Sequence, residues 1–155
     1  MESFRAVLKA LHEHDVEYIL IGGVAVIFHG VSRVTKDLDI FVKREPENIE
    51  KLKGALRSVF DDESINEITH DELKQYPVIR YGTPLNYYID IMDRIGTAFE
   101  YEDLEYEVVE SKGIPIRVAT IETLIKLKEN TVRIRDRSDV MLLWDKLKRK
   151  NDANL

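Results

Sequence analysis

The hydrophobic positions of the chain follow a helical period first and then a strand pattern. Apolar residues recur every three or four positions from about Ser3 to His14, which predicts an amphipathic helix. An apolar strand is expected from Tyr18 to Ile21, and Gly22-Gly23 ends it. A short buried helix from Val24 to His29 and an alternating strand from Asp37 to Val42 are expected next. The first third of the chain is therefore predicted to be a helix followed by a strand–helix–strand unit.

The remaining pattern indicates more strands and then helices. The further expected elements are a helix from Pro46 to about Phe60, a short strand from Ile65 to Ile68, a hairpin of 78–81 with 86–92, a strand pair of 105–109 with 114–118, and helices over about 120–130 and 138–150. Thr120 is the expected N-cap of the first of these two helices. Strands followed by helices predict an α+β (mixed α/β) domain. A chain of 155 residues suits one domain, with a core over about 1–118 and a C-terminal helical pair over about 119–150.

The composition narrows the classes of function. The chain has no cysteine, which excludes disulfides, thiolate catalysis and thiolate zinc sites. Its net charge of −6 argues against broad, non-specific binding of duplex nucleic acid. No apolar run is long enough to span a bilayer, and the first residues resemble the start of a helix rather than a signal peptide. The simplest expected location is the cytoplasm.

Two aspartates alternate with apolar residues at the start of the second predicted strand. Because side chains alternate along a strand, Asp37 and Asp39 project from one face, while Leu38 and Ile40 point into the core. Neighbouring carboxylates repel each other unless a cation lies between them. Magnesium prefers such hard oxygen ligands, and a substrate phosphate with water completes its coordination. An acid-x-acid pair alone is more often a pair of solvated acids on a strand or turn. The surrounding residues therefore decide whether the pair indicates a metal site.

A third acid repeats this pattern later in the chain. Asp90 lies between Ile89 and Ile91, so it points away from the core if the isoleucines point into it. If this strand lies beside the first, Asp90 joins Asp37 and Asp39. Three carboxylates can hold two metal ions about 3.5–4 Å apart, an arrangement that aligns an attacking hydroxyl with a leaving pyrophosphate.

A glycine turn and its neighbours are candidates for contacting phosphate. Gly22-Gly23 separates an apolar strand from an apolar helix, where backbone N–H groups can approach phosphate oxygens. Arg33 and Thr35 lie in the connection to the acidic strand, within reach of a triphosphate. Taken singly, such a turn is more often only a tight turn, and a loop arginine is usually solvated.

Together these residues resemble a known signature. Ile21-Gly22-Gly23, followed after thirteen residues by Asp37-Leu38-Asp39-Ile40 and by a third acid on a later strand, resembles the polymerase β-like nucleotidyltransferase superfamily. The segment between them, 29–36, resembles the small prokaryotic members, which include abortive-infection toxins and antibiotic-modifying enzymes. The resemblance covers about Tyr18 to Met92 and implies the nucleotidyltransferase fold.

The resemblance also implies a role for each matching residue. Gly22 and Gly23 would contact the nucleotide phosphates, and Asp37 and Asp39 would bind magnesium, with two metal ions expected. Asp90 would complete the metal site and is the candidate base for the proton of the acceptor. The implied reaction is attack of an acceptor hydroxyl on the α-phosphate of a nucleoside triphosphate, with ATP expected, and release of pyrophosphate. The protein would act mainly by positioning groups and neutralising charge.

The C-terminal helices offer two further candidates. Lys128 and Arg133 resemble the lysine and arginine that follow the core in small members of this superfamily and contact phosphates. Thr131-Val132 depart from the small residues often found there. The alternative, given equal weight, is that these charged residues lie at the start of a helix and form surface ion pairs, each of which contributes little to stability. Trp144 is expected to pack in the core together with its apolar neighbours Met141, Leu142, Leu143 and Leu147.

Two other classes of protein compete with the enzyme interpretation. A phosphatase or glycosyltransferase with its own acid-x-acid motif is disfavoured, because Phe41 stands where such phosphatases carry threonine. A non-catalytic nucleotide-binding protein, or one half of a toxin–antitoxin pair that retains the fold, stays open. The acceptor is unknown: a small molecule, an RNA and a protein all remain candidates. Because the domain is small, a second copy or a protein partner is a candidate for completing the acceptor site.

Overall fold

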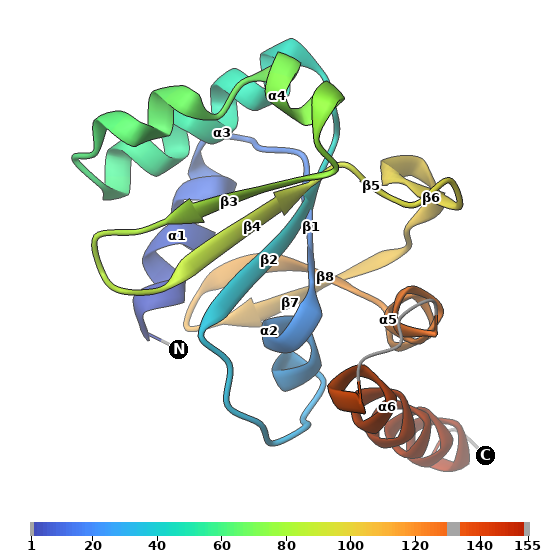
Figure 1. The fold of residues 1–155 in the computed structure, drawn as a ribbon. Helices are drawn as coiled ribbons and strands as arrows, with labels where there is room; N and C mark the ends of the chain where they lie inside the picture. Colours follow the sequence, from blue (N-terminus) through green and yellow to red (C-terminus); the bar gives the residue numbers. More distant parts are fainter. Residues whose placement is uncertain (1, 130–133, 154–155) are drawn as a thin grey trace.

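The computed structural model describes residues 2–129 and 134–153, with the backbone alone for 134–140. Its centre is a six-stranded mixed sheet with the order β3-β4-β2-β1-β8-β7 (Figure 1). The strands are β1 (Tyr18–Ile21), β2 (Asp37–Val42), β3 (Val78–Gly82), β4 (Tyr88–Met92), β7 (Tyr106–Ser111) and β8 (Ile114–Ala119). A small separate ribbon is formed by β5 (Arg94–Ile95) and β6 (Phe99–Glu100). Strands and helices that are mixed in this way confirm the predicted α+β class.

The middle of the sheet is formed by strands that are distant in sequence. β1 pairs antiparallel with β2 and parallel with β8, while β2 pairs parallel with β4. In this register Asp39 lies opposite Ile21 on one side and opposite Asp90 on the other. The arrangement that would unite the acids, with β4 beside β2, is therefore present.

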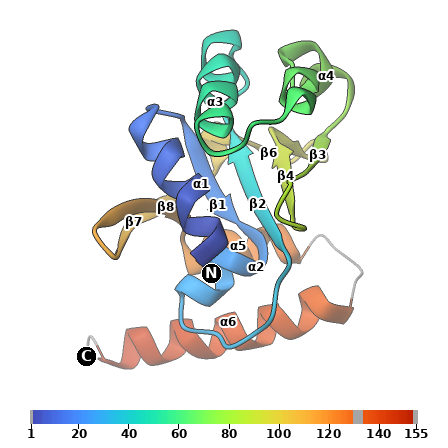
Figure 2. The same ribbon diagram turned by 90° about the vertical axis from the view of Figure 1, so that its left-hand side faces the viewer.

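Helices cover both faces of the sheet. α1 (Glu2–Glu13) and α3 (Pro46–Val59) pack against each other on one face, and α5 (Ile121–Lys128) lies on the opposite side (Figures 1 and 2). α2 (Gly22–Phe28) follows β1 directly and packs against β1 and β2. The core between these layers is apolar and fully buried at most positions of β1 and β2. Burial of this apolar surface fixes the ends of the central strands in place.

Several predicted elements agree with the structure and one does not. β1 and β2 have the predicted bounds, and α1 and α3 end within a residue of theirs. The strand predicted from Ile65 to Ile68 is wrong: the segment is the 3₁₀ helix η1 (Glu63–Glu67), and Asp62 caps it by accepting a hydrogen bond from the backbone N–H of Ser64. Sequence reasoning missed α4 (His70–Gln75), the β5–β6 ribbon and the 3₁₀ helix η2 (Tyr101–Asp103).

The C-terminal helices pack differently from the prediction. Thr120 caps α5 as expected, because its hydroxyl accepts a hydrogen bond from the N–H of Thr123. α6 (Ile134–Ala153) is longer than predicted and packs against α5. Leu143 and Leu147 are buried, whereas 51% of Trp144 is exposed. The predicted core positions of Trp144, Met141 and Leu142 are therefore wrong, since α6 buries one i, i+4 stripe and these three side chains lie outside it.

Across the described part of the chain, no helix has the length and apolar character needed to cross a membrane.

Candidate active site

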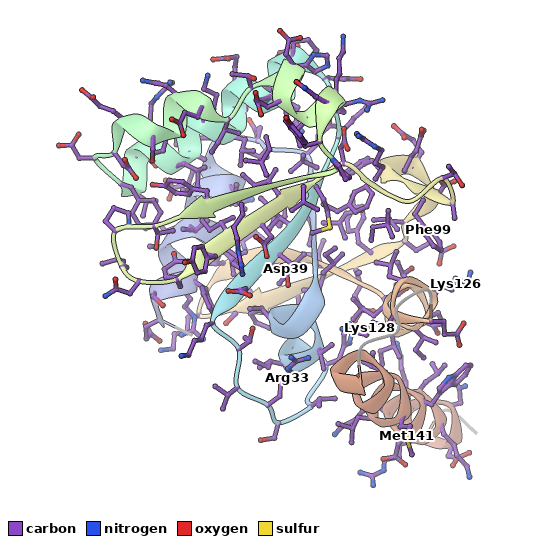
Figure 3. All side chains as sticks on the ribbon, in the orientation of Figure 1. Arg33, Asp39, Phe99, Lys126, Lys128 and Met141 are labelled. Atoms are coloured by element: carbon purple, nitrogen blue, oxygen red, sulfur yellow. The ribbon has the colours of Figure 1, made fainter. Side chains whose placement is uncertain are left out.

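A cavity of about 610 Å³ gathers the residues singled out from the sequence. The predicted residues that line it are Gly22, Gly23, Arg33, Thr35, Asp37, Asp39, Asp90 and Lys128. The other predicted residue, Arg133, lies outside the described residues. Segments far apart in the sequence thus meet around one space, with Asp39 on β2, Arg33 on the loop before it and Lys128 at the end of α5 (Figure 3).

Strand geometry brings the three acids to one place. Leu38 and Ile40 are fully buried, so Asp37 and Asp39 project from the other face of β2. Asp90 is placed in the same way on β4, between two fully buried isoleucines. Because Asp39 and Asp90 are partners in the parallel ladder, their carboxyl groups are neighbours on one face.

This proximity changes how the acids ionise. Burial, together with the adjacent Asp90 carboxylate and the hydrogen bond between the two groups, raises the pKa of Asp39 to about 7. Asp37 adds to this rise, and the positive charge of Lys128 opposes it. Burial also raises the pKa of Asp90, against the lowering effect of Arg80. The Asp39–Asp90 pair therefore holds a proton more tightly than isolated carboxyl groups would.

Arg80 is a site residue that sequence reasoning missed. It lies on β3 opposite Asp90, and its side chain spans two of the acids. Its Nη2 is 3.0 Å from Oδ2 of Asp37, and its Nε is 3.2 Å from Oδ1 of Asp90. The guanidinium also lies 4.1 Å from the centre of the Tyr88 ring. No sequence motif includes Arg80. The one available signal was that Arg80 lies on the predicted hairpin strand 78–81, which pairs with the strand that carries Asp90.

The glycine turn is tightly enclosed by these residues. Gly22 has φ +69°, and a Cβ atom there would lie 2.0 Å from Oδ2 of Asp39. A Cβ atom on Gly23 would lie 3.0 Å from Oγ1 of Thr35 and 3.3 Å from Cζ of Arg33. Thr35 in turn donates a hydrogen bond to the carbonyl of Asp37. The turn, the loop and the acidic strand therefore form one packed unit in which the absence of side chains leaves backbone accessible to a ligand.

The other wall of the cavity is apolar. It is formed by Val78 of β3, Met92 of β4, Ile95 of β5, and Leu124 and Leu127 of α5. None of these was a predicted site residue. The cavity thus combines a wall of charged and glycine residues with an apolar wall, which is typical of sites that bind organic ligands carrying phosphate.

The donor set fits a hard divalent cation. Oδ1 of Asp90 is buried and makes no hydrogen bond, although Arg80 is near it. All the acidic donors are carboxylate oxygens, which magnesium prefers over nitrogen or sulfur. Within the described residues, no three acidic or imidazole side chains are already gathered closely enough to enclose a metal ion.

The family of the chain agrees with this geometry. Residues 6–143 match the model of the family described as nucleotidyl transferase AbiEii toxin, Type IV TA system. The chain therefore belongs to the AbiEii nucleotidyltransferase family and is a nucleotidyltransferase, an enzyme that transfers nucleoside monophosphates. The resemblance to small toxin-like nucleotidyltransferases is confirmed.

Solved structures share the fold. The lincosamide antibiotic adenylyltransferase LnuA, with lincomycin bound, has a TM-score of 0.63 at 14% identity and covers 92% of this chain and 94% of its own. ANT(2")-Ia, in complex with adenylyl-2"-tobramycin, has a TM-score of 0.55 at 13% identity over 97% of this chain and 90% of its own. TM1012 from Thermotoga maritima has a TM-score of 0.51 at 15% identity over 99% and 87%. At these identities the likeness establishes the fold alone. A comparison with curated protein sequences gave no match.

The contact between Gly22 and Asp39 gives a first prediction. Gly22→Ala should cost about 1–2 kcal/mol for the left-handed backbone and more for the clash with the Asp39 side chain. Gly113→Ala is the matched control, because Gly113 has φ +80° and nothing lies within 4 Å of a Cβ atom there. Urea denaturation should show the larger loss for Gly22→Ala, and calorimetry should show loss of nucleotide binding for that variant only. Equal stability losses with intact binding in both variants would contradict this packing.

The shifted pKa of Asp39 gives a second prediction, for the metal-free protein. Its pKa is about 7 in the folded state, against 3.8 for an ordinary aspartate, so the folded state holds this proton more tightly. The resulting stability is complete below about pH 4 and is lost as the pH rises through about 7. Asp39→Asn has no such loss, so its free energy of unfolding should rise relative to the parent as the pH increases. Urea titrations in EDTA from about pH 5 to 8 measure this difference. A difference that is constant across the range would show that Asp39 is ionised throughout.

Proposed function

We propose that the chain is a magnesium-dependent nucleotidyltransferase that moves a nucleoside monophosphate from a nucleoside triphosphate, with ATP expected, to an acceptor hydroxyl and releases pyrophosphate. The observation that supports this most strongly is the meeting of Asp37, Asp39 and Asp90 in one cavity with the Gly22-Gly23 turn. Three neighbouring carboxylates, two of which (Asp39 and Asp90) have a raised pKa, are suited to binding a cation and a polyphosphate together with the backbone turn.

In this proposal the acids divide two tasks. Asp37, Asp39 and Asp90 hold magnesium, for which two ions are expected. When bound, the metal supplies positive charge to the phosphate oxygens and lowers the pKa of a coordinated hydroxyl. Asp90 accepts the proton of the acceptor hydroxyl, because burial has already raised the pKa of Asp90 above that of an ordinary carboxyl group.

The cations and the glycine turn bind the triphosphate. The backbone at Gly22 and Gly23 approaches phosphate oxygens, since neither residue has a side chain to block them. Arg33 lies against Gly23 and carries the planar donor fork that suits phosphate. Lys128 and Thr35 line the same cavity. Arg133 stays a proposed phosphate ligand on the resemblance alone.

The acceptor is proposed only as a class. The family name describes a toxin of a type IV toxin–antitoxin system, which supports a toxin half whose action an antitoxin counters. LnuA and ANT(2")-Ia, which share the fold, carry antibiotic ligands. The apolar wall of Val78, Met92 and Ile95 lies beside Asp90, so we place the acceptor against it. An acceptor with an apolar face next to its reactive hydroxyl fits this wall.

A labelling experiment tests the reaction. The protein is incubated with magnesium and each α-³²P-labelled nucleoside triphosphate, together with pooled RNA, cell protein or small hydroxylated molecules. One fraction should gain label from at least one nucleotide, and pyrophosphate should appear in equal amount. Asp37→Asn and Asp39→Asn should lower the transfer rate about a hundredfold or more, because each removes a metal ligand. Transfer at the parent rate by both variants would rule out the metal assignment.

The role of Lys128 is tested by a pair of variants on one helix. Lys128 is half-buried in the cavity wall, whereas Lys126, two positions away on α5, is exposed. Lys128→Ala should weaken ATP binding about tenfold, the value of one charge-assisted contact. Lys126→Ala, which removes the same charge, should leave the affinity close to that of the parent. Calorimetric titration of both variants decides this, and equal affinities would return Lys128 to a surface role.

A further inference from the structure

Arg80 lies in the position where two of the proposed metal ligands face each other. We propose that Arg80 is the internal counter-cation of the carboxylate cluster: it bridges Asp37 and Asp90 before substrate binds, and a divalent metal must displace it to enter. This inference rests on the proposed function, because it concerns the same three acids. It assigns to Arg80 a positioning role that controls when the metal site forms.

The contacts of Arg80 are those of a charge bridge between two strands. The guanidinium reaches Asp37 on β2 through Nη2 and Asp90 on β4 through Nε, at 3.0 Å and 3.2 Å. The Tyr88 ring, 4.1 Å away, supports the guanidinium from the side. Arginine stays charged at all relevant pH values, so this bridge does not switch off by deprotonation. In the structure it balances part of the negative charge that would otherwise repel within the cluster.

The same contacts show why the bridge is replaceable. The Arg80 side chain is 52% exposed, so the guanidinium itself can move into solvent. Its contact with Asp90 is an ion pair without a hydrogen bond, and Oδ1 of Asp90 stays unsatisfied. The Asp90 side chain is only 17% exposed, so its charge needs a new partner when Arg80 leaves, and a divalent cation supplies one. A metal held by Asp37 and Asp90 would satisfy that oxygen better than Arg80 does.

The bridge also explains why the acids do not yet enclose a metal position. Asp37 is drawn toward β3 by Arg80, while Asp39 shares its hydrogen bond with Asp90. Release of Arg80 frees Asp37 and Asp90 to turn toward a shared cation. Since Arg80 lines the cavity, a released guanidinium remains beside the polyphosphate. A metal that arrives with its nucleotide therefore meets less opposition than a metal alone, because the phosphates attract the displaced arginine.

Metal titration without nucleotide tests the proposal. Mn²⁺ binding is measured by electron paramagnetic resonance for the parent, Arg80→Gln and Arg57→Gln. The control residue, Arg57, is an exposed arginine on α3 that contacts Asn66. Its change to glutamine removes the same charge as Arg80→Gln. Arg80→Gln should bind Mn²⁺ about three- to tenfold more tightly, because the metal no longer competes with the guanidinium for Asp37 and Asp90. Arg57→Gln should match the parent, and circular dichroism should show that all three proteins are folded.

The outcomes separate this proposal from the proposed function. Unchanged or weaker Mn²⁺ binding in Arg80→Gln would overturn the competition and make Arg80 a residue that supports the metal ligands. Arg80→Lys keeps the charge but not the fork, and tightening equal to that of Arg80→Gln would also overturn the charge bridge. Asp39→Asn added to Arg80→Gln should abolish the binding. Binding that survives this double change, or no binding by any variant, would instead contradict the metal site of the proposed function.

Discussion

The repulsion between neighbouring carboxylates is the constraint on which the rest of this site depends. Parallel pairing of β2 with β4 places Asp39 directly opposite Asp90, and Asp37 lies two residues away on the same face. Such a cluster is unfavourable unless protons or cations balance it. In the structure the guanidinium of Arg80 supplies part of this balance, and the raised pKa values of Asp39 and Asp90 favour a retained proton as the other part. A bound magnesium would replace both, so the cost of bringing the acids together is what makes the site attract a metal.

The surrounding fold keeps the acids in this arrangement. Leu38, Ile40, Ile89 and Ile91 are fully buried, and any twist that moved the acids apart would expose them. Gly22 allows the turn after β1 to lie against the Asp39 carboxylate. In the proposed function, substrate phosphate and metal would be bound by this one packed unit, which favours preorganised electrostatic catalysis.

The sequence predicted the parts of this site that depend on local pattern. Alternation along each strand indicated the direction of the acids, and the Gly-Gly turn indicated the nearby backbone. Arg80 escaped prediction because its role depends on the register between β3 and β4, which no local pattern reveals. Ile65 to Ile68 failed as a strand because an Asp cap at Asp62 favours a 3₁₀ turn there. The prediction that Trp144 is buried was wrong because a helix that packs on one neighbour buries only a narrow stripe of side chains.

The central claim is that Asp37, Asp39 and Asp90 bind metal together with a nucleoside triphosphate. A crystal structure of the protein with Mn²⁺ and a non-hydrolysable ATP analogue, with anomalous diffraction to locate the metal, tests this most directly. The account predicts an anomalous peak about 2.1 Å from oxygens of the three aspartates, the polyphosphate beside Gly22-Gly23, and Arg80 moved away from Asp37. A nucleotide bound elsewhere, or metal density that avoids the three acids, would contradict it.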